Sequence, residues 1–372
     1  MTDSYRTCTR CIMDTSDPDI VFDDAGVCNH CYRYEDQLNR RVAPTGERSA
    51  RLEALVAEIK AQGRGRDYDC VIGVSGGVDS TYVAWLTKEL GLRPLAVHFD
   101  NGWNSELAVA NIEKTLERLG IDLSTFVIDW EEFKDLQLSF LKASTPDGEV
   151  PTDHAIVALL YQAAAKQGLK HILLGTNVAS EAIMPIKWGY GYSDYRYIKA
   201  VQERFGSKKL RTYPHYSLPK LFEYMFVRKI RIVPILDFVD YRKGDAMKRI
   251  ENDLGWTYYG GKHYESIYTR FYQAYVLPKK FGIDKRRAHN ANLVLSGQMG
   301  REVALVGLEA PTAPEDQMRE DMEYVCKKFG LSQAEFDALM VLPTRTFLDY
   351  PNSYKRLEQA KKVLRFLRGR EG

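Results

Sequence analysis

The chain has 372 residues, which is enough for two or three domains. Hydrophobic residues make up 45% and charged residues 27%, so the chain can bury a sizeable core as ordinary globular proteins do. The formal net charge of +2 gives no strong attraction to nucleic acid, and we expect no nucleic-acid partner. Residues 1–6 have no apolar signal core, and no apolar run approaches the roughly 20 residues of a membrane span. We therefore expect a soluble, cytoplasmic protein with no membrane partner.

The N-terminal block, residues 1–45, is rich in cysteines and turn residues. Cys8-x-x-Cys11 and Cys28-x-x-Cys31 form two short knuckles that are separated by sixteen residues. Four thiolates paired in this way match a closed, tetrahedral and structural Zn²⁺ site, so we predict a zinc ribbon. Two alternatives stay open, namely disulfides or a redox pair, and an iron–sulfur cluster. We expect His30 to be a bystander, because the four cysteines already satisfy the ion.

The middle block, residues 46–240, alternates short apolar runs with helical patterns, and residues 241–372 read as mostly helical. Strands are predicted at 70–74, 95–99, 126–128 and 172–174, with helices near 80–90, 106–119 and 154–167. Gly91, Gly120 and Gly168 stand where helices of this kind end. The alternation predicts an α/β fold whose parallel sheet binds ligands at the carboxyl ends of its strands. We predict three domains: a ribbon (1–45), a nucleotide-binding domain (46–240) and a substrate or partner region (241–372).

The most specific motif follows the first predicted strand and opens a helix. It comprises Val74, Ser75, Gly76, Gly77, Val78, Asp79 and Ser80. The two glycines let the backbone turn tightly and approach an anion, and the helix start supplies free N–H groups and a positive dipole end. The alternative is a capped turn without a ligand. The motif is neither a Walker loop nor a dinucleotide fingerprint, because Gly-Lys-Ser/Thr and G-x-G-x-x-G are both absent.

This motif resembles the S-G-G-x-D-S PP-loop of the ATP pyrophosphatase superfamily. Members cleave ATP between the α and β phosphates and adenylylate a second substrate. The resemblance implies that residues 74–80 bind ATP and that Asp79 acts in catalysis, holding the loop or a Mg²⁺ ion.

Two further strand ends fit this superfamily. The resemblance implies that Phe99 and Asp100 contact adenine and ribose, and that Gly175-Thr176-Asn177 is a second nucleotide loop. It also implies that Glu181 helps to hold Mg²⁺. A plain turn role for Asp100 and a solvated helix face for Glu181 remain alternatives.

The segment 260–271 places Lys, His, Glu and Arg beside glycines and aromatics. A cation here would clamp a phosphate or a substrate carboxylate, and we predict catalytic roles for Lys262 and Arg270. A solvated helix face with aromatic core contacts is the alternative. The basic stretch 187–231 is either a second surface for an anionic substrate or a solvated surface. Residues 296–301 predict a loop before another helix.

Taken in order, the ribbon, the PP-loop, Gly175-Thr176-Asn177, residues 260–266 (GGKHYES) and 284–289 (DKRRAH) resemble the N-acetyl sugar amidotransferases of bacterial surface-polysaccharide and nonulosonic acid synthesis. The resemblance spans nearly the whole chain. It implies that ATP adenylylates the oxygen of an acetamido group and that ammonia then displaces AMP to leave an acetamidino group. The implied substrate is an anionic sugar, either a nucleotide-linked diacetamido uronic acid or a nonulosonic acid.

The cysteines of the sequence bear on the source of ammonia, because a glutaminase needs a cysteine nucleophile. Residue 2 is threonine, and none of the six cysteines lies in a Gly-x-Cys-x-Gly elbow, so no glutaminase nucleophile is placed. The family resemblance implies that partners similar to the glutaminase and cyclase subunits of imidazole-glycerol-phosphate synthase deliver it.

Two competing functions remain at this point. One is a tRNA sulfurtransferase, which commonly needs a reactive cysteine in the PP-loop domain, where this chain has only Cys70 on a predicted inward strand. The other is a scaffold without catalysis.

Overall fold

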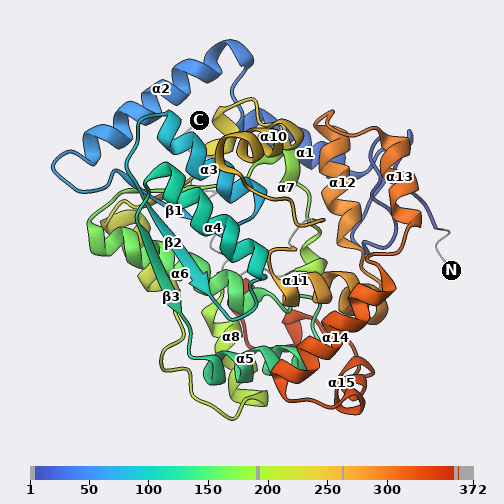
Figure 1. Cartoon of the computed structure of the whole chain (residues 1–372). Coiled ribbons are helices and arrows are strands. Elements are labelled where there is room, and N and C mark those ends of the chain that lie inside the picture. Colours follow the sequence, from blue (N-terminus) through green and yellow to red (C-terminus); the bar gives the residue numbers. More distant parts are fainter. Residues whose placement is uncertain (1–4, 190–192, 262–263, 356–358, 360–372) are drawn as a thin grey trace.

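The computed structural model describes residues 5–189, 193–261, 264–355 and 359, and it places one parallel sheet inside layers of helices (Figure 1). The five strands lie in the order β3-β2-β1-β4-β5, and every neighbouring pair is parallel. Their bounds are β1 Cys70–Gly73, β2 Pro94–Asp100, β3 Leu123–Val127, β4 His171–Leu174 and β5 Arg231–Pro234. The predicted α/β fold with a parallel sheet is confirmed.

Both edge strands differ from the prediction. β3 begins at Leu123 rather than at 126 and ends before Ile128, and most of its residues are exposed, so it lacks the apolar run that marks a buried strand. β5 was not predicted. It pairs with β4 from Arg231 to Pro234, and its first residue is an exposed arginine. A strand that ends in proline is tolerated at a sheet edge, where a missing N–H costs no ladder bond.

The helices of the N-terminal and middle blocks connect and cover the sheet. They are α1 Asn29–Arg41, α2 Thr45–Gln62, α3 Val78–Glu89, α4 Glu106–Leu119, α5 Trp130–Ala143, α6 Val150–Gln167, α7 Val178–Glu181, α8 Tyr195–Phe205 and α9 Leu218–Phe222. The predicted helices at 80–90, 106–119 and 154–167 are α3, α4 and α6, and Gly120 and Gly168 cap the last two in the left-handed conformation.

The region after the sheet is mostly helical, as predicted. Its helices are α10 Lys243–Leu254, α11 Ile267–Phe271, α12 Lys285–Leu295, α13 Arg301–Glu309, α14 Glu315–Phe329 and α15 Gln333–Met340. Wider π-helical turns continue α9 over Glu223–Val227 and α11 over Tyr272–Phe281, and single 3₁₀ turns lie at Ile186–Trp188, Ile235–Phe238 and Phe347–Asp349. The predicted loop at 296–301 separates α12 from α13.

The core lies on both faces of the sheet. Successive residues of β1 point to opposite faces, so Val71 packs in one cluster with Leu160 of α6, and Ile72 packs in the other with Val83 of α3 and Ile112 of α4. A parallel sheet needs this double cover. Within the described ranges, we find no helix whose length and apolar character would let it cross a membrane.

Candidate active site

The PP-loop lies between the end of β1 and the start of α3. Gly76 has φ +78°, and a Cβ added there would stand 2.5 Å from the carbonyl oxygen of Ala108, so only glycine fits. The Ser75 and Ser80 hydroxyls lie 3.1 Å apart, and Ser75 Oγ accepts from the backbone N–H of Gly77. The loop is therefore preformed at the N-terminus of a twelve-residue helix, where the dipole favours anions.

The segment Gly175-Thr176-Asn177, predicted to be a second nucleotide loop, packs directly against the PP-loop. A Cβ on Gly175 would come within 2.9 Å of the Asp79 backbone, so this glycine permits the close approach of the two loops. Asn177 caps α7 by accepting from the Ser180 N–H at 2.9 Å, and Thr176 is exposed between them. β1 and β4 are neighbours, but β2 lies on the far side of β1. The loops therefore meet where the strand order reverses, the point at which such sheets bind ligands.

The buried hydroxyl of Tyr241 lies beside the PP-loop. Tyr241, which follows β5, donates its hydroxyl to Asp79 Oδ1. Burial and then the charge of Asp79 raise the pKa of Tyr241, and the charge of Glu181 raises it further. The charges of both Asp79 and Glu181 therefore act on the Tyr241 hydroxyl.

The segment 256–259, which follows α10, is hydrogen-bonded to the backbone of the PP-loop. Trp256 donates its indole N–H to the Gly76 carbonyl at 2.8 Å. Tyr259 accepts from the Val78 N–H through its hydroxyl at 3.2 Å, and that hydroxyl stands 3.2 Å from where a Gly77 Cβ would be. Neither residue is predicted from the sequence, because aromatic residues in a helical region are typical of a hydrophobic core.

The end of β2 approaches the PP-loop through an unpredicted histidine. His98 Nδ1 donates to the Val74 carbonyl at 2.9 Å. The Phe99 ring is buried and packs edge-on against Phe133, with the ring centroids 5.8 Å apart. Asp100 accepts from the Gly102 N–H at 2.9 Å, the turn role that was left open. Nucleotide contacts of Phe99 and Asp100 stay predictions.

An acidic group that was not predicted lies at the start of α6, at the same edge of the sheet. Glu149 and Asp153 are four positions apart on one helix face. Burial raises the pKa of Glu149 to about 7; its Oε2 accepts from the Thr269 hydroxyl at 2.7 Å, and its Oε1 has no hydrogen-bond partner in the described part of the chain. The charge of Lys285 opposes this rise.

Asp153 behaves differently. Its surface is accessible to solvent, yet desolvation by the surrounding protein and then the charges of Asp147 and Glu149 raise its pKa to about 8. The charge of Glu181 also acts on Asp153, which connects the acidic group to the nucleotide loops. Among the described residues these carboxylates form no group of three at metal-binding spacing.

Of the two cations predicted to clamp the substrate, the structure describes Arg270 but not Lys262. Arg270 on α11 forms a two-bond ion pair with the buried Asp321, at 2.7 and 2.6 Å, so its charge is already neutralised in this structure. Lys262 lies outside the described residues. In the basic stretch, Lys187, Lys208, Lys220, Arg228 and Arg231 are each paired with an acid. Substrate contacts by any of these cations stay predictions.

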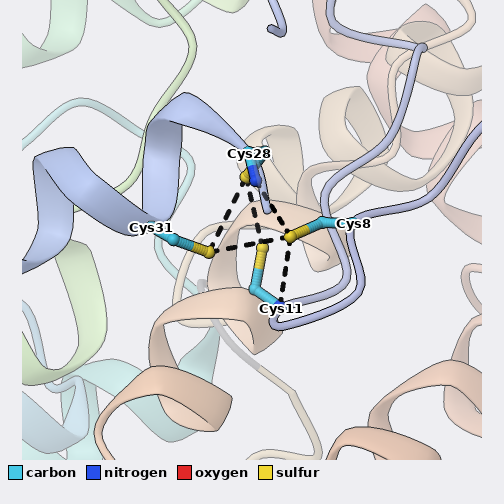
Figure 2. A group of neighbouring side chains, drawn as sticks. All are labelled: Cys8, Cys11, Cys28 and Cys31. Carbon is cyan, nitrogen blue, oxygen red and sulfur yellow. Dashed lines mark hydrogen bonds between the residues drawn. The ribbon is translucent and has the colours of Figure 1, made fainter. Parts of the chain in front are cut away.

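The four predicted cysteine ligands converge (Figure 2). Their sulfurs all lie within 4.8 Å of one another, and three of the pairs are 3.6–3.8 Å apart. Four sulfurs at 2.3 Å from a tetrahedral ion stand about 3.8 Å from each other, whereas a disulfide requires about 2.05 Å. All four residues are fully buried. The residues fit one tetrahedral ion and no disulfide, and zinc with four cysteines is the common case.

The cysteine-bearing segment is docked on the remainder of the chain. Arg301 donates to the carbonyls of Cys8 and Cys11 at 2.8 and 3.0 Å, and Arg287 donates to the Ile12 carbonyl at 2.7 Å. His30 donates to Asp17 at 2.6 Å and lies outside the ligand set, as expected.

A second connection joins the ribbon to the nucleotide loops. Arg41, at the end of α1, pairs with the buried Asp237 at 2.7 Å, and Asp237 accepts from the Val178 N–H at 2.8 Å. The ribbon therefore touches the start of α7, directly after the second nucleotide loop. The division into three domains stays a prediction.

Two family models match the chain without overlapping. An NAD synthase model matches residues 49–216, which include the PP-loop and the predicted second nucleotide loop. A model described as "LPS biosynthesis protein WbpG-like, C-terminal domain" matches residues 265–363. Together the two matches support a WbpG-like family of PP-loop amidotransferases. The two matches agree with the family resemblance of the sequence, and they support an ATP-using, amidotransferase-like enzyme.

The chain also matches solved structures at low sequence identity. NMN synthetase from Francisella tularensis is 16% identical, with 78% of this chain and 98% of that chain covered and a TM-score of 0.33. A predicted tRNA methyltransferase subunit from Methanocaldococcus jannaschii is 14% identical, with 49% and 75% covered and a TM-score of 0.28. The NH₃-dependent NAD synthetase from Campylobacter jejuni is 16% identical, with 57% and 85% covered and a TM-score of 0.29. No curated protein matches the chain.

Proposed function

We propose that this WbpG-like enzyme converts an acetamido group on an anionic sugar into an acetamidino group, with cleavage of ATP to AMP and pyrophosphate. The observation that carries the proposal is the close approach of Gly175 to the backbone of Asp79, which brings the PP-loop and the predicted second nucleotide loop together at the strand-order reversal. The WbpG-like match over residues 265–363 supports a sugar of lipopolysaccharide synthesis as the second substrate.

The chemistry explains the need for ATP. An amide oxygen is a poor leaving group, so it first attacks the α-phosphorus of ATP, and the bond to the β-phosphate breaks to release pyrophosphate. The PP-loop N–H groups would hold the departing phosphates. Asp79 and Glu181 would hold Mg²⁺, which neutralises phosphate charge when it is bound. Ammonia then adds to the activated carbon, and the C–O bond breaks with its electron pair leaving on AMP.

The nitrogen nucleophile must arrive without its extra proton. We assign this task to the acidic group of α6, where the buried Glu149 Oε1 has no protein partner within the described ranges. An ammonium ion beside Glu149 would satisfy that oxygen and transfer one proton to it, which leaves neutral ammonia to attack. Ammonia itself would come from a glutaminase partner with a cyclase-like subunit, because no cysteine of this chain is placed as a glutaminase nucleophile.

The substrate would be a nucleotide-linked diacetamido uronic acid or a nonulosonic acid. The test incubates the purified chain with ATP, each sugar and either ammonium or glutamine, and follows the sugar by mass spectrometry. We expect a mass loss of about one unit with ammonium, no reaction with glutamine alone, and AMP with pyrophosphate as products. Formation of ADP and phosphate, or reaction with glutamine in the absence of a partner, would contradict the proposal.

A further inference from the structure

A cavity of about 200 Å³ lies between the ribbon and the loops that follow β4 and β5. It is separate from the acidic group of α6, and the sequence analysis did not predict it. Its wall includes Tyr34 of α1, Arg48 of α2, Asn177, Tyr241, Arg242 and Ser296. The cavity therefore has one side made by the cysteine-bearing segment and another made by the nucleotide-binding edge.

The charges of the wall favour an anion. Arg48 Nε is buried and has no hydrogen-bond partner in the described part of the chain. The two Nη atoms of Arg48 make only long contacts, to the carbonyls of Val239 and Ala43 at 3.5 Å and to the highly exposed Asp240 at 3.6 Å. The guanidinium of Arg242 makes no hydrogen bond or ion pair with any described residue. The one buried acid of the wall, Asp237, is already neutralised by Arg41. A buried donor without a partner is costly, so an acceptor is expected to complete the site.

The position of the cavity connects it to the reaction. Asn177 belongs to the second nucleotide loop, and the Tyr241 hydroxyl donates to Asp79 of the PP-loop. A ligand in the cavity would therefore be separated from Asp79 of the PP-loop by the side chain of Tyr241. Whole-ligand pockets usually measure about 300–1,000 Å³, so this cavity is sized for one end of a larger substrate rather than for a nucleoside diphosphate.

We propose that this cavity binds the carboxylate end of the sugar, with Arg48 and Arg242 as its two cationic partners. The inference rests on the proposed function and adds the place where the anionic substrate is recognised. Arginine pairs with carboxylates through two parallel hydrogen bonds, which fixes orientation as well as charge. The sugar ring then lies against Tyr34 of α1, which makes the metal-bound segment part of the substrate site.

The test separates sugar binding from nitrogen chemistry. Sugar-dependent exchange of labelled pyrophosphate into ATP needs no ammonia, and we would measure it with a UDP-linked diacetamido uronic acid, a free diacetamido nonulosonic acid and the methyl ester of each. Arg48→Ala and Arg242→Ala should each raise the KM for the acid about 10- to 100-fold and leave the KM for ATP within twofold. Arg51→Ala is the matched control, because Arg51 lies one turn along α2, is exposed and pairs with Glu47.

The methyl esters identify the group that is bound. Esterification should raise the KM of the wild-type protein as much as Arg48→Ala does, and it should add nothing further in the variant. An unchanged KM in both arginine variants, or an ester effect that persists in both, overturns the inference. Because Arg242 is exposed, its variant keeps the test valid if Arg48→Ala fails to fold.

Failure of the proposed function has a different signature. If wild-type protein exchanges pyrophosphate with none of these sugars, the amidotransferase reaction is wrong, and the cavity is then tested by calorimetric titration of the same acids without ATP. Binding that is lost in Arg48→Ala and kept in Arg51→Ala supports the cavity. No binding to wild-type protein overturns it.

Discussion

The cysteine centre and the nucleotide-binding edge are assembled from very different lengths of chain. All four sulfurs come from residues 8–31, and one ion would fix their geometry. The nucleotide-binding edge is assembled from residues between 74 and 259. The Gly76 carbonyl accepts a hydrogen bond from Trp256, and Gly175 packs against the backbone of Asp79. A local site of this kind depends on its metal, whereas a distributed site depends on the completed fold. Changes at the first should therefore affect folding, and changes at the second should affect chemistry.

The largest effect is expected at the ribbon. Cys28→Ser should abolish metal binding and unfold the N-terminal block, since structural zinc contributes on the order of 10–16 kcal/mol in zinc-finger peptides. Metal analysis and thermal unfolding measure this, with the buried non-ligand Cys326→Ala as the control. Stoichiometric zinc in the Cys28 variant, or iron in wild-type protein, would contradict the structural-zinc assignment.

A large effect without a folding defect is expected at the PP-loop. Asp79→Asn should slow formation of AMP and pyrophosphate about 100- to 1,000-fold, because removing one charge-stabilising group commonly costs about 2.7–4 kcal/mol. Zinc content and melting temperature should stay close to wild type. The exposed Glu113→Gln of α4 serves as the control. Equal loss of stability and activity in the Asp79 variant would place this residue in folding rather than in chemistry.

The acidic group of α6 should give a pH dependence of stability. The pKa of Glu149 is raised from 4.5 to about 7, so the folded state resists ionisation. No stability is lost below about pH 4.5, and up to about 3 kcal/mol is lost as the pH rises from there through 7. Urea unfolding should therefore show a smaller decline between pH 5 and 7.5 for Glu149→Gln than for wild type. Parallel curves would mean that Glu149 is not desolvated.

The smallest effect is expected at Tyr259, whose hydroxyl is hydrogen-bonded to the PP-loop. Tyr259→Phe removes the hydroxyl that accepts the Val78 N–H. In the ATP complex, a phosphate oxygen would accept the Val78 N–H in place of Tyr259. The substitution therefore removes a hydrogen bond from the free protein but none from the ATP complex, which favours ATP binding. The KM for ATP should fall by up to about tenfold, the equivalent of a bond of about 0.5–1.5 kcal/mol. A rise above tenfold would mean that Tyr259 itself contacts ATP.

The sequence predicted the features that are encoded locally. Apolar runs marked the central strands, Gly120 and Gly168 marked helix ends, and the knuckles and the PP-loop each lie in one short segment. The edge strand β5 is not predicted because it begins at an arginine and ends at a proline, which leaves no continuous apolar run. An edge strand does not require such a run.

The remaining parts depend on partners that are distant in the sequence. Nothing near Arg270 indicates that Asp321 neutralises it, and nothing near Tyr259 indicates that it reaches the PP-loop. The raised pKa of Glu149 comes first from burial, which only the packed fold determines. Periodicity predicts the faces of elements, but it does not predict which side chains of separate elements meet.

Oxygen transfer is the most direct measurement of amide activation. A sugar that carries ¹⁸O in its acetamido group is incubated with the purified chain, ATP and ammonium, and the AMP is analysed by mass spectrometry. The proposed reaction breaks the carbon–oxygen bond after adenylylation, so one ¹⁸O should appear in each AMP. Unlabelled AMP, or label in pyrophosphate or free phosphate, would contradict activation of the amide oxygen by this enzyme.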